Sequence, residues 1–323
     1  QYFKYIGIMD HLNLKKMDVN GFDMISFDDD KTEYPHAQGF ENFIEKLTQY
    51  FPEEKENLER YCQKIKAVCK TFPLYNLESE GKYDDEILTL NAKETIDSFT
   101  QNEKLKAVLA GSNFLYAGIA EKSPFYVHAL VVNSYIESSW RCVNGGSQIT
   151  KQLLKQLKNF GGEFFKHKEV TEIEVENQKV NSVKMKDGTE VSGTYFISNI
   201  EPKTTLKMAG QENFRKPFFN RIQNLESVLS AFSLYIVFKP KTFKYINHNY
   251  YHFKSANDVW TSYEYDENSW PKTFMASMNP SKKDEEWADG MTFLTYMKYD
   301  DVKAWENTFN TTFEENDRGE SYE

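Results

Sequence analysis

The segment between Gly145 and Asn199 limits the fold more than any other part of the chain, because its pattern changes there from helical to alternating. A Gly-Gly pair precedes apolar residues at helical spacing over 149–160, which predicts a helix with one buried side. A second pair, Gly161-Gly162, ends this helix, since glycine adopts the left-handed C-cap conformation without steric cost. The segment is therefore expected to place a helix beside a β meander.

The meander follows directly. Its expected β segments are 164–165, 170–175, 180–185 and 190–191, with a hairpin turn at Asp187-Gly188. The apolar run Tyr195-Phe196-Ile197 then predicts a strand buried within a parallel sheet, ending at Ser198-Asn199.

The rest of the chain is helical first and β-rich later. The expected elements are a hairpin over 22–34, helices over 40–51, from Pro52 onward and near 93–100, 103–118 and 124–139, strands over 228–238, 250–265, 274–278 and 291–297, and a final helix over 302–309. The fold class is therefore α/β (α+β), a mixed sheet with a helical layer.

Composition excludes several classes of protein. Among 323 residues, 40% are hydrophobic and 27% charged, which is typical of a globular chain. A net charge of −10 without a run of Lys and Arg argues against nucleic acid as a partner. We expect a cytoplasmic protein, because no apolar run reaches about 18 residues and the start lacks a signal-peptide pattern.

No metal site and no catalytic side chain can be assigned from the sequence. Cys62 and Cys69 are too far apart on a helix for a disulfide, and no C-x-x-C spacing exists. His248 and His252 are four residues apart, but the residues between them favour strand or turn and no third ligand is evident. Asp28-Asp29-Asp30 lacks the glycine and distal glutamate of a calcium loop, so we interpret it as a solvated turn.

Gly145-Gly146 has a possible binding role on physical grounds. A Gly-Gly pair at a helix start exposes backbone N–H groups at the positive end of the helix, which suits an anion or a polar ligand edge. The strands that follow would bring their carboxyl ends to a ligand, as in open α/β sheets. Taken alone, the pair is more often a simple bend.

In combination, these motifs resemble the phytoene desaturase, carotenoid isomerase and retinol saturase family of FAD-dependent oxidoreductases. The resemblance is dense over 145–202 and looser elsewhere; it rests on Gly145-Gly146-Ser147, Gly161-Gly162-Glu163, Val170-Thr171-Glu172-Ile173, Lys186-Asp187-Gly188-Thr189 and 196–202. It implies that the backbone of Val170 contacts the adenine of FAD and that Ser198-Asn199 approaches the dinucleotide. It also implies that Gly145-Gly146 lies near the flavin side of the substrate cavity.

The chain departs from the family pattern at two places. It has neither the G-x-G-x-x-G motif that cradles the pyrophosphate nor the C-terminal Gly-rich segment. We interpret the chain as a central fragment with half a cofactor site. Since one backbone contact contributes about 1 kcal/mol, we expect this chain alone to bind FAD weakly or not at all.

The resemblance implies a substrate domain in two parts, 1–142 and 211–323, and a flavin-domain segment over 143–210. It further implies hydride transfer between flavin and an apolar isoprenoid or polyene, with NAD(P) as a candidate electron donor. An apolar tunnel is expected between the helices of 93–139 and the sheet of 226–297. Peripheral membrane contact and a homodimer stay open. So do two alternative functions, a non-catalytic lipid-binding module and an amine-oxidase-like flavoenzyme with a polar substrate.

Overall fold

The computed structural model describes residues 2–78, 84–225, 230–306 and 308. The chain divides into two compact units: unit 1 comprises Gln1–Thr150 and Leu229–Glu323, and unit 2 comprises Lys151–Val228. These borders fall later in the chain than the borders at 142/143 and 210/211 expected from the sequence pattern, and the three-part domain division stays a prediction.

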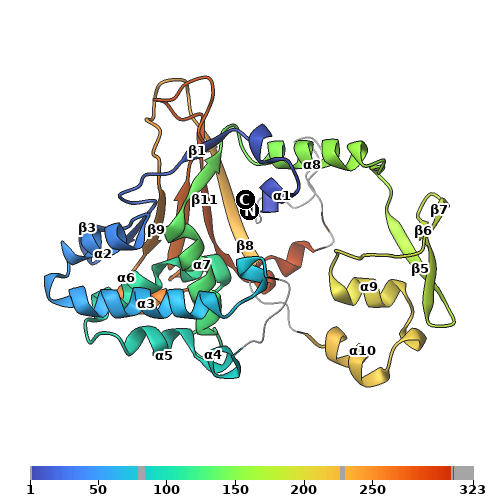
Figure 1. Ribbon diagram of the computed structural model, residues 1–323, viewed down its shortest axis with the longest axis horizontal. Helices are drawn as coiled ribbons and strands as arrows, with labels where there is room; N and C mark the ends of the chain where they lie inside the picture. The colour runs from blue at the N-terminus through green and yellow to red at the C-terminus, as the bar shows by residue number, and fades with distance from the viewer. Residues whose placement is uncertain (1, 79–83, 226–229, 307, 309–323) are drawn as a thin grey trace. The chain divides into compact units, whose positions relative to one another are not determined.

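A six-stranded mixed sheet forms the centre of unit 1 (Figure 1). Its order is β3-β2-β9-β10-β11-β8, in which the pair β2–β9 is parallel and all other pairs are antiparallel. The strands are β2 (Asp23–Phe27), β3 (Asp30–His36), β8 (Ser230–Val237), β9 (Asn249–Phe253), β10 (Thr273–Ser277) and β11 (Gly290–Met297). A separate pair joins β1 (Leu14–Lys16) to β4 (Trp140–Cys142). The predicted mixed sheet is confirmed.

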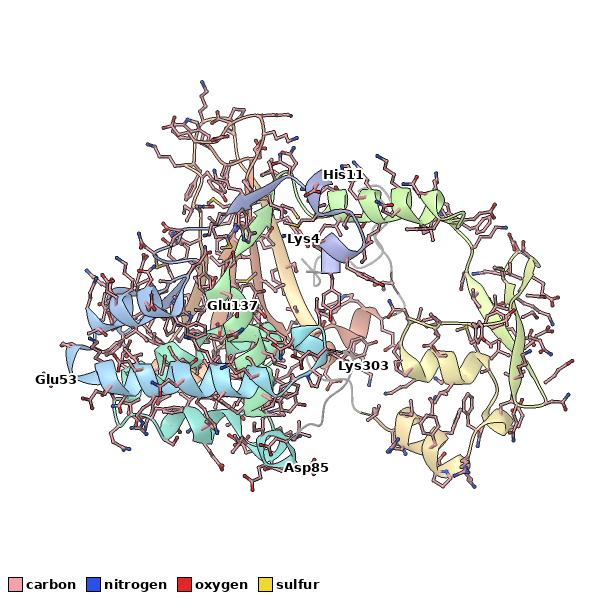
Figure 2. The ribbon with its side chains drawn as sticks, in the orientation of Figure 1. Lys4, His11, Glu53, Asp85, Glu137 and Lys303 are labelled. Atoms are coloured by element: carbon pink, nitrogen blue, oxygen red, sulfur yellow. The ribbon has the colours of Figure 1, made fainter. Side chains whose placement is uncertain are left out.

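Helices cover one face of this sheet, as predicted (Figure 1). They are α2 (Phe40–Thr48), α3 (Lys55–Lys70), α5 (Ala92–Asp97), α6 (Glu103–Ala110) and α7 (Phe125–Glu137), and the short helix α4 (Asp85–Thr89) contacts α7. Unit 1 also contains the short helices α1 (Tyr2–Tyr5) and α11 (Tyr299–Val302). Charged residues such as Glu53 and Asp85 are exposed at the outside of this layer (Figure 2). Of the final helix expected over 302–309, residues 307 and 309 lie outside the described residues.

The helical layer and the sheet meet in a packed aromatic core. The Phe114 ring stacks on Tyr296 with centroids 4.5 Å apart and meets the edge of Tyr251. Deeper in the helical layer, the buried His128 ring lies between two tyrosine hydroxyls, 2.8 Å from Tyr61 and 2.9 Å from Tyr116. Large buried side chains therefore occupy the space in which an apolar tunnel was expected.

Unit 2 has a much smaller core. It contains the antiparallel meander β5 (Val170–Glu176), β6 (Lys179–Met185) and β7 (Glu190–Ser192), helices α9 (Pro202–Met208) and α10 (Lys216–Gln223), and most of α8 (Ser147–Asn159). Among its described residues, Ser182, Leu206 and Ala209 are buried.

Three predictions about unit 2 are wrong. The 164–165 segment is not a strand, and α8 buries none of its residues. The run Tyr195-Phe196-Ile197 is also no strand, and Tyr195 and Ile197 are 90% and 95% exposed. The physical reason is common to all three: apolar periodicity predicts burial only where a second surface covers the element, and no described residue covers these segments.

Candidate functional site

A pocket of about 440 Å³ lies within unit 2, between the meander and the start of α9. Its lining combines apolar side chains of β5 and β6 with the 196–200 segment and residues of α9 and the turn that follows it. Val170, Ser198 and Asn199 line it together, although 27 residues of chain separate Val170 from Ser198. Three of the five residues predicted to bind the cofactor are thus brought to one place.

Strand pairing explains the apolar wall of this pocket. Ile173 lies opposite Val183 and Val175 opposite Val180 in the β5–β6 hairpin. Ile173, Val180 and Val183 line the pocket with Val170, so one side of the hairpin presents aliphatic groups to it. Such a surface suits one flat face of an aromatic ring system.

The opposite wall depends on how α9 begins. Glu201 caps the helix, with a carboxylate oxygen accepting from the Thr204 N–H at 2.7 Å, and Pro202 occupies the first turn. One turn later, the Thr205 hydroxyl lies 2.7 Å from the Ser198 hydroxyl. This contact ties the segment before the helix to the helix itself and holds Ser198 and Asn199 at the pocket, with both side chains exposed.

Gly145 and Gly146 belong to unit 1, where they form the turn between β4 and α8. The Gly145 N–H donates to the Cys142 carbonyl at 3.1 Å, and φ of Gly145 is +86°, a value that favours glycine. A Cβ atom built at either glycine would meet nothing within 4 Å, so the space beside both backbones is open. The predicted approach of a ligand edge to this turn is sterically allowed and stays a prediction.

A buried polar network that no sequence pattern predicted adjoins this turn. The Asn249 amide donates to the Asp23 carboxylate at 2.7 Å, and the Arg141 guanidinium donates to the Asn249 side-chain oxygen at 2.5 Å and to the Met278 carbonyl. Asp23 is 1% exposed. Burial raises the pKa of Asp23 to about 7. The hydrogen bond from Asn249 and the positive charge of Arg141 lower this pKa, but burial has the larger effect.

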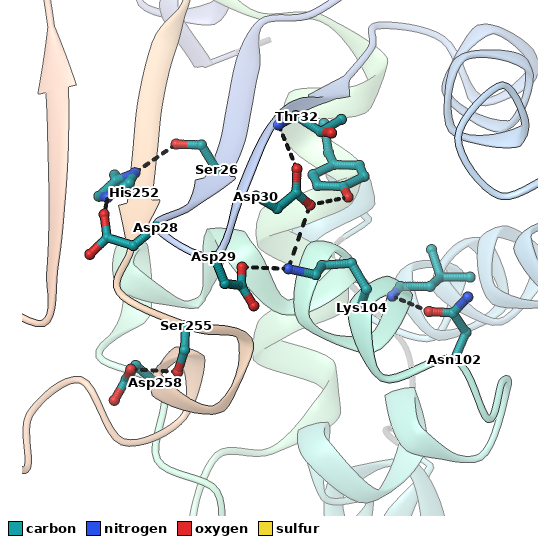
Figure 3. Close-up of polar contacts among 12 residues, drawn as sticks. Ser26, Asp28, Asp29, Asp30, Thr32, Asn102, Lys104, His252, Ser255 and Asp258 are labelled. Atoms are coloured by element: carbon teal, nitrogen blue, oxygen red, sulfur yellow. Dashed lines mark hydrogen bonds and ion pairs between the residues drawn. The ribbon is translucent and has the colours of Figure 1, made fainter.

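A second group, also missed, joins a serine, a histidine and an aspartate (Figure 3). The His252 ring lies 2.9 Å from the Ser26 hydroxyl through Nδ1 and 2.8 Å from the Asp28 carboxylate through Nε2. Ser26 and His252 are direct cross-strand partners in β2 and β9. In hydrolytic triads the aspartate is buried, whereas the Asp28 side chain is 62% exposed, so we interpret the group as a structural cross-strand contact.

The acidic turn Asp28-Asp29-Asp30 forms ion pairs with a lysine side chain of α6 (Figure 3). Lys104 Nζ lies 2.8 Å from the Asp29 carboxylate and 3.6 Å from that of Asp30. Partial burial raises the pKa of Asp30, but hydrogen bonds from Thr32 and Tyr34 outweigh it and lower the pKa to about 2. Across the described residues, no group of three or more His, Cys, Asp or Glu side chains is arranged to hold a metal ion.

Comparison with known proteins finds sequence similarity to enzymes of the kind that the motifs resemble. No protein-family model matches the chain. All-trans-retinol 13,14-reductase of Rattus norvegicus is 22% identical over 312 residues, which cover 85% of this chain and 51% of that protein. The same enzyme of Danio rerio is 24% identical over 150 residues, covering 40% of this chain and 24% of that protein. The chain thus spans about half the length of the rat enzyme, and its match to the Danio rerio enzyme covers about a quarter of that protein.

Solved structures support the fold. An oxidoreductase from Methanosarcina mazei is similar with a TM-score of 0.57 and 14% identity, covering 95% of this chain and 66% of that one. A putrescine oxidase redesigned in its cofactor binding is similar with a TM-score of 0.52 and 10% identity, covering 97% of this chain and 64% of that one.

None of the helices in the described ranges is long and apolar enough to span a bilayer. The chain is thus similar to the all-trans-retinol 13,14-reductases over part of their length, and its fold is similar to that of solved oxidoreductases.

Proposed function

We propose that unit 2 contributes part of the FAD site, and unit 1 the substrate side, of an oxidoreductase acting on C–C bonds of an apolar isoprenoid or polyene. One observation carries the proposal: Val170, Ser198 and Asn199, which the family resemblance assigns to FAD, line a single pocket. The relationship to all-trans-retinol reductases supports the substrate class.

The pocket fits one part of the cofactor. Its volume of about 440 Å³ lies within the usual range of small-ligand pockets, roughly 300–1,000 Å³. The aliphatic side chains of Val170, Ile173 and Val183 would pack against the adenine ring, and the Ser198 and Asn199 side chains would offer hydrogen-bonding groups at its edge. No G-x-G-x-x-G motif is present to hold the pyrophosphate, so these residues supply a partial site.

Bound FAD would supply the redox chemistry, which is the exchange of a hydride and a proton with a C–C bond of the substrate. The contribution of this chain is positioning. Val170, Ser198 and Asn199 would hold one end of the cofactor, and the open Gly145-Gly146 turn would allow close approach of a ligand edge. NAD(P) is the proposed source of electrons.

The test uses full-length protein, the present chain, and a matched pair of variants. Full-length protein should show flavin absorption and saturable FAD binding, and the isolated chain should bind FAD at least tenfold more weakly. Val170→Trp fills the pocket and should lower FAD affinity of the full-length protein at least tenfold. Val191→Trp, placed on the exposed strand β7 outside the pocket lining, is the control and should bind FAD normally.

Two outcomes would contradict the proposal. Colourless full-length protein that takes up no FAD would make a lipid-binding module the better interpretation. Equal FAD affinity in the Val170 and Val191 variants would show that the cofactor does not use this pocket.

A further inference from the structure

The side chain of Gln148 holds the turn that contains Gly145 and Gly146. Its amide oxygen accepts from the Asn13 N–H at 2.7 Å, and its amide nitrogen donates to the Asn13 carbonyl at 3.1 Å. The same nitrogen lies 2.9 Å from the Val143 carbonyl and 3.3 Å from the Gly145 carbonyl. One side chain thus connects the first turn of α8, the glycine turn before it and the residue that precedes β1.

These contacts use every polar group of the Gln148 amide. A glutamine amide has one oxygen acceptor and two hydrogens, and here the two hydrogens are shared among three carbonyls. The Asn13 carbonyl also accepts from the Val143 N–H at 2.9 Å, so Gln148 extends the hydrogen bonding of the β1–β4 pair. A side chain without both a donor and an acceptor cannot replace it.

The turn needs such support because its backbone conformation is unfavourable. Asn144 and Gly145 are consecutive residues with φ of +61° and +86°, and left-handed φ is costly for a residue with a side chain. A second segment also holds Asn144. Its N–H donates to the Pro280 carbonyl at 2.8 Å, and its side-chain oxygen accepts from the Lys282 N–H at 3.0 Å. Hydrogen bonds from two separate segments of unit 1 therefore fix the turn in one conformation.

None of these contacts fills the space beside the two glycines. A Cβ atom built at Gly145 or Gly146 would meet nothing within 4 Å, and Gly146 is exposed. The turn is thus fixed in shape and open on one side. A ligand that binds to such a preorganised backbone causes little further loss of conformational entropy.

We propose that Gln148 is a positioning residue, which presets the Gly145-Gly146 turn for the edge of the cofactor. This inference rests on the proposed function for the identity of the ligand. Gln148 acts through the turn rather than by contact with the cofactor. Its loss would leave the turn to be ordered when the cofactor binds, at the expense of affinity.

The test measures FAD affinity by fluorescence titration of the full-length protein and its variants. Gln148→Met keeps the length and the helix propensity of the side chain but removes its polar groups. It should weaken FAD binding roughly three- to tenfold, the effect of about one neutral hydrogen bond. Gln152→Met makes the same substitution one turn further along α8 and should leave FAD affinity unchanged.

Gln148→Glu gives a measurement that a change in packing alone would not alter. Its carboxylate can still accept from the Asn13 N–H, but it faces the carbonyls of Asn13, Val143 and Gly145 and must bind a proton before it can donate to one of them. FAD affinity, relative to the unmodified protein at the same pH, should therefore recover as the pH falls from about 8 to about 5. The relative affinity of Gln148→Met should stay constant.

Urea unfolding of the same proteins shows whether each variant folds, and Gln148→Glu at the two pH values still tests the role of the side chain if Gln148→Met does not fold. Equal FAD affinity in the two methionine variants, or a loss in Gln148→Glu that does not change with pH, would overturn the inference. If the unmodified protein binds FAD and Gln148→Met binds it equally well, only the positioning role is refuted. A full-length protein that binds no FAD refutes the proposed function and, with it, positioning toward FAD.

Discussion

Replacing Asp23 with asparagine should make unit 1 more stable at neutral pH and change its stability little in acid. Asp23 is 1% exposed, and burial raises its pKa from 3.8 to about 7, the Asn249 hydrogen bond and the Arg141 charge acting in the opposite direction. The folded protein thus binds this proton more tightly than the unfolded chain does. The contribution of Asp23 to stability must then fall as pH rises between about 4 and about 7.

The magnitude follows from the two pKa values. Each tenfold difference in proton affinity corresponds to about 1.4 kcal/mol, so the interval from 3.8 to about 7 corresponds to roughly 4 kcal/mol. Asparagine has nearly the same shape and carries an oxygen that can still accept from the Asn249 amide. It also removes a negative charge near Arg141, which reduces the gain. We therefore expect Asp23→Asn to stabilise unit 1 by roughly 1–4 kcal/mol at pH 7.5 and by less than about 1 kcal/mol at pH 4.5.

Urea unfolding followed by tryptophan fluorescence is the appropriate assay. The chain has five tryptophans, and their positions, 140, 260, 270, 287 and 305, all fall within the ranges of unit 1. The signal therefore reports unit 1 alone. Asp85→Asn, at an exposed site in α4, controls for the change in net charge.

Parallel pH profiles for the Asp23 variant and the unmodified protein would refute the reasoning. So would a loss of stability on substitution at pH 7.5 that exceeds the loss at pH 4.5. Either result would mean that Arg141 neutralises the Asp23 charge more effectively than the geometry indicates.

Two further predictions concern single contacts. Tyr61→Phe removes the hydroxyl 2.8 Å from His128 Nε2 in the core and should cost roughly 1–3 kcal/mol of unfolding free energy, measured by the same fluorescence assay; a change below about 0.5 kcal/mol would contradict it. Gly145→Ala places a side chain at φ +86° and should cost about 1–2 kcal/mol, whereas Gly146→Ala, where φ is not positive, should cost less than half as much. Equal costs at the two glycines would show that the turn relaxes.

Local patterns predicted most elements of unit 1, but the strand expected over 250–265 ends at Phe253, and a short 3₁₀ helix over Ala256–Val259 follows it. The helix faces over 40–51 and from Pro52 onward, and the hairpin at Asp28-Asp29-Asp30, depend on residues a few positions apart. Once α3 forms, its apolar stripe has the rest of the helical layer to pack against, so periodicity and burial agree there. The mixed sheet with a helical layer follows from these elements and their order.

The networks of unit 1 lie beyond such patterns because they join distant segments. Asp23, Arg141 and Asn249 come from three strands, and only the parallel pairing of β2 with β9 brings the first and last together. Sequence spacing contains no sign of this arrangement.

The errors in unit 2 and its expected weak FAD binding have one physical origin. Apolar side chains at 195 and 197 and along α8 follow patterns that usually become buried, yet the described residues leave them exposed. The Val170–Ser198 pocket has walls from the meander and α9. The sequence has no G-x-G-x-x-G motif to bind the phosphates of a ligand in this pocket. A ligand bound there would gain aliphatic packing and a few hydrogen bonds, while its charged portion would stay in water. The apolar surface that misled the prediction of burial and the pocket without a phosphate-binding motif thus belong to the same small unit.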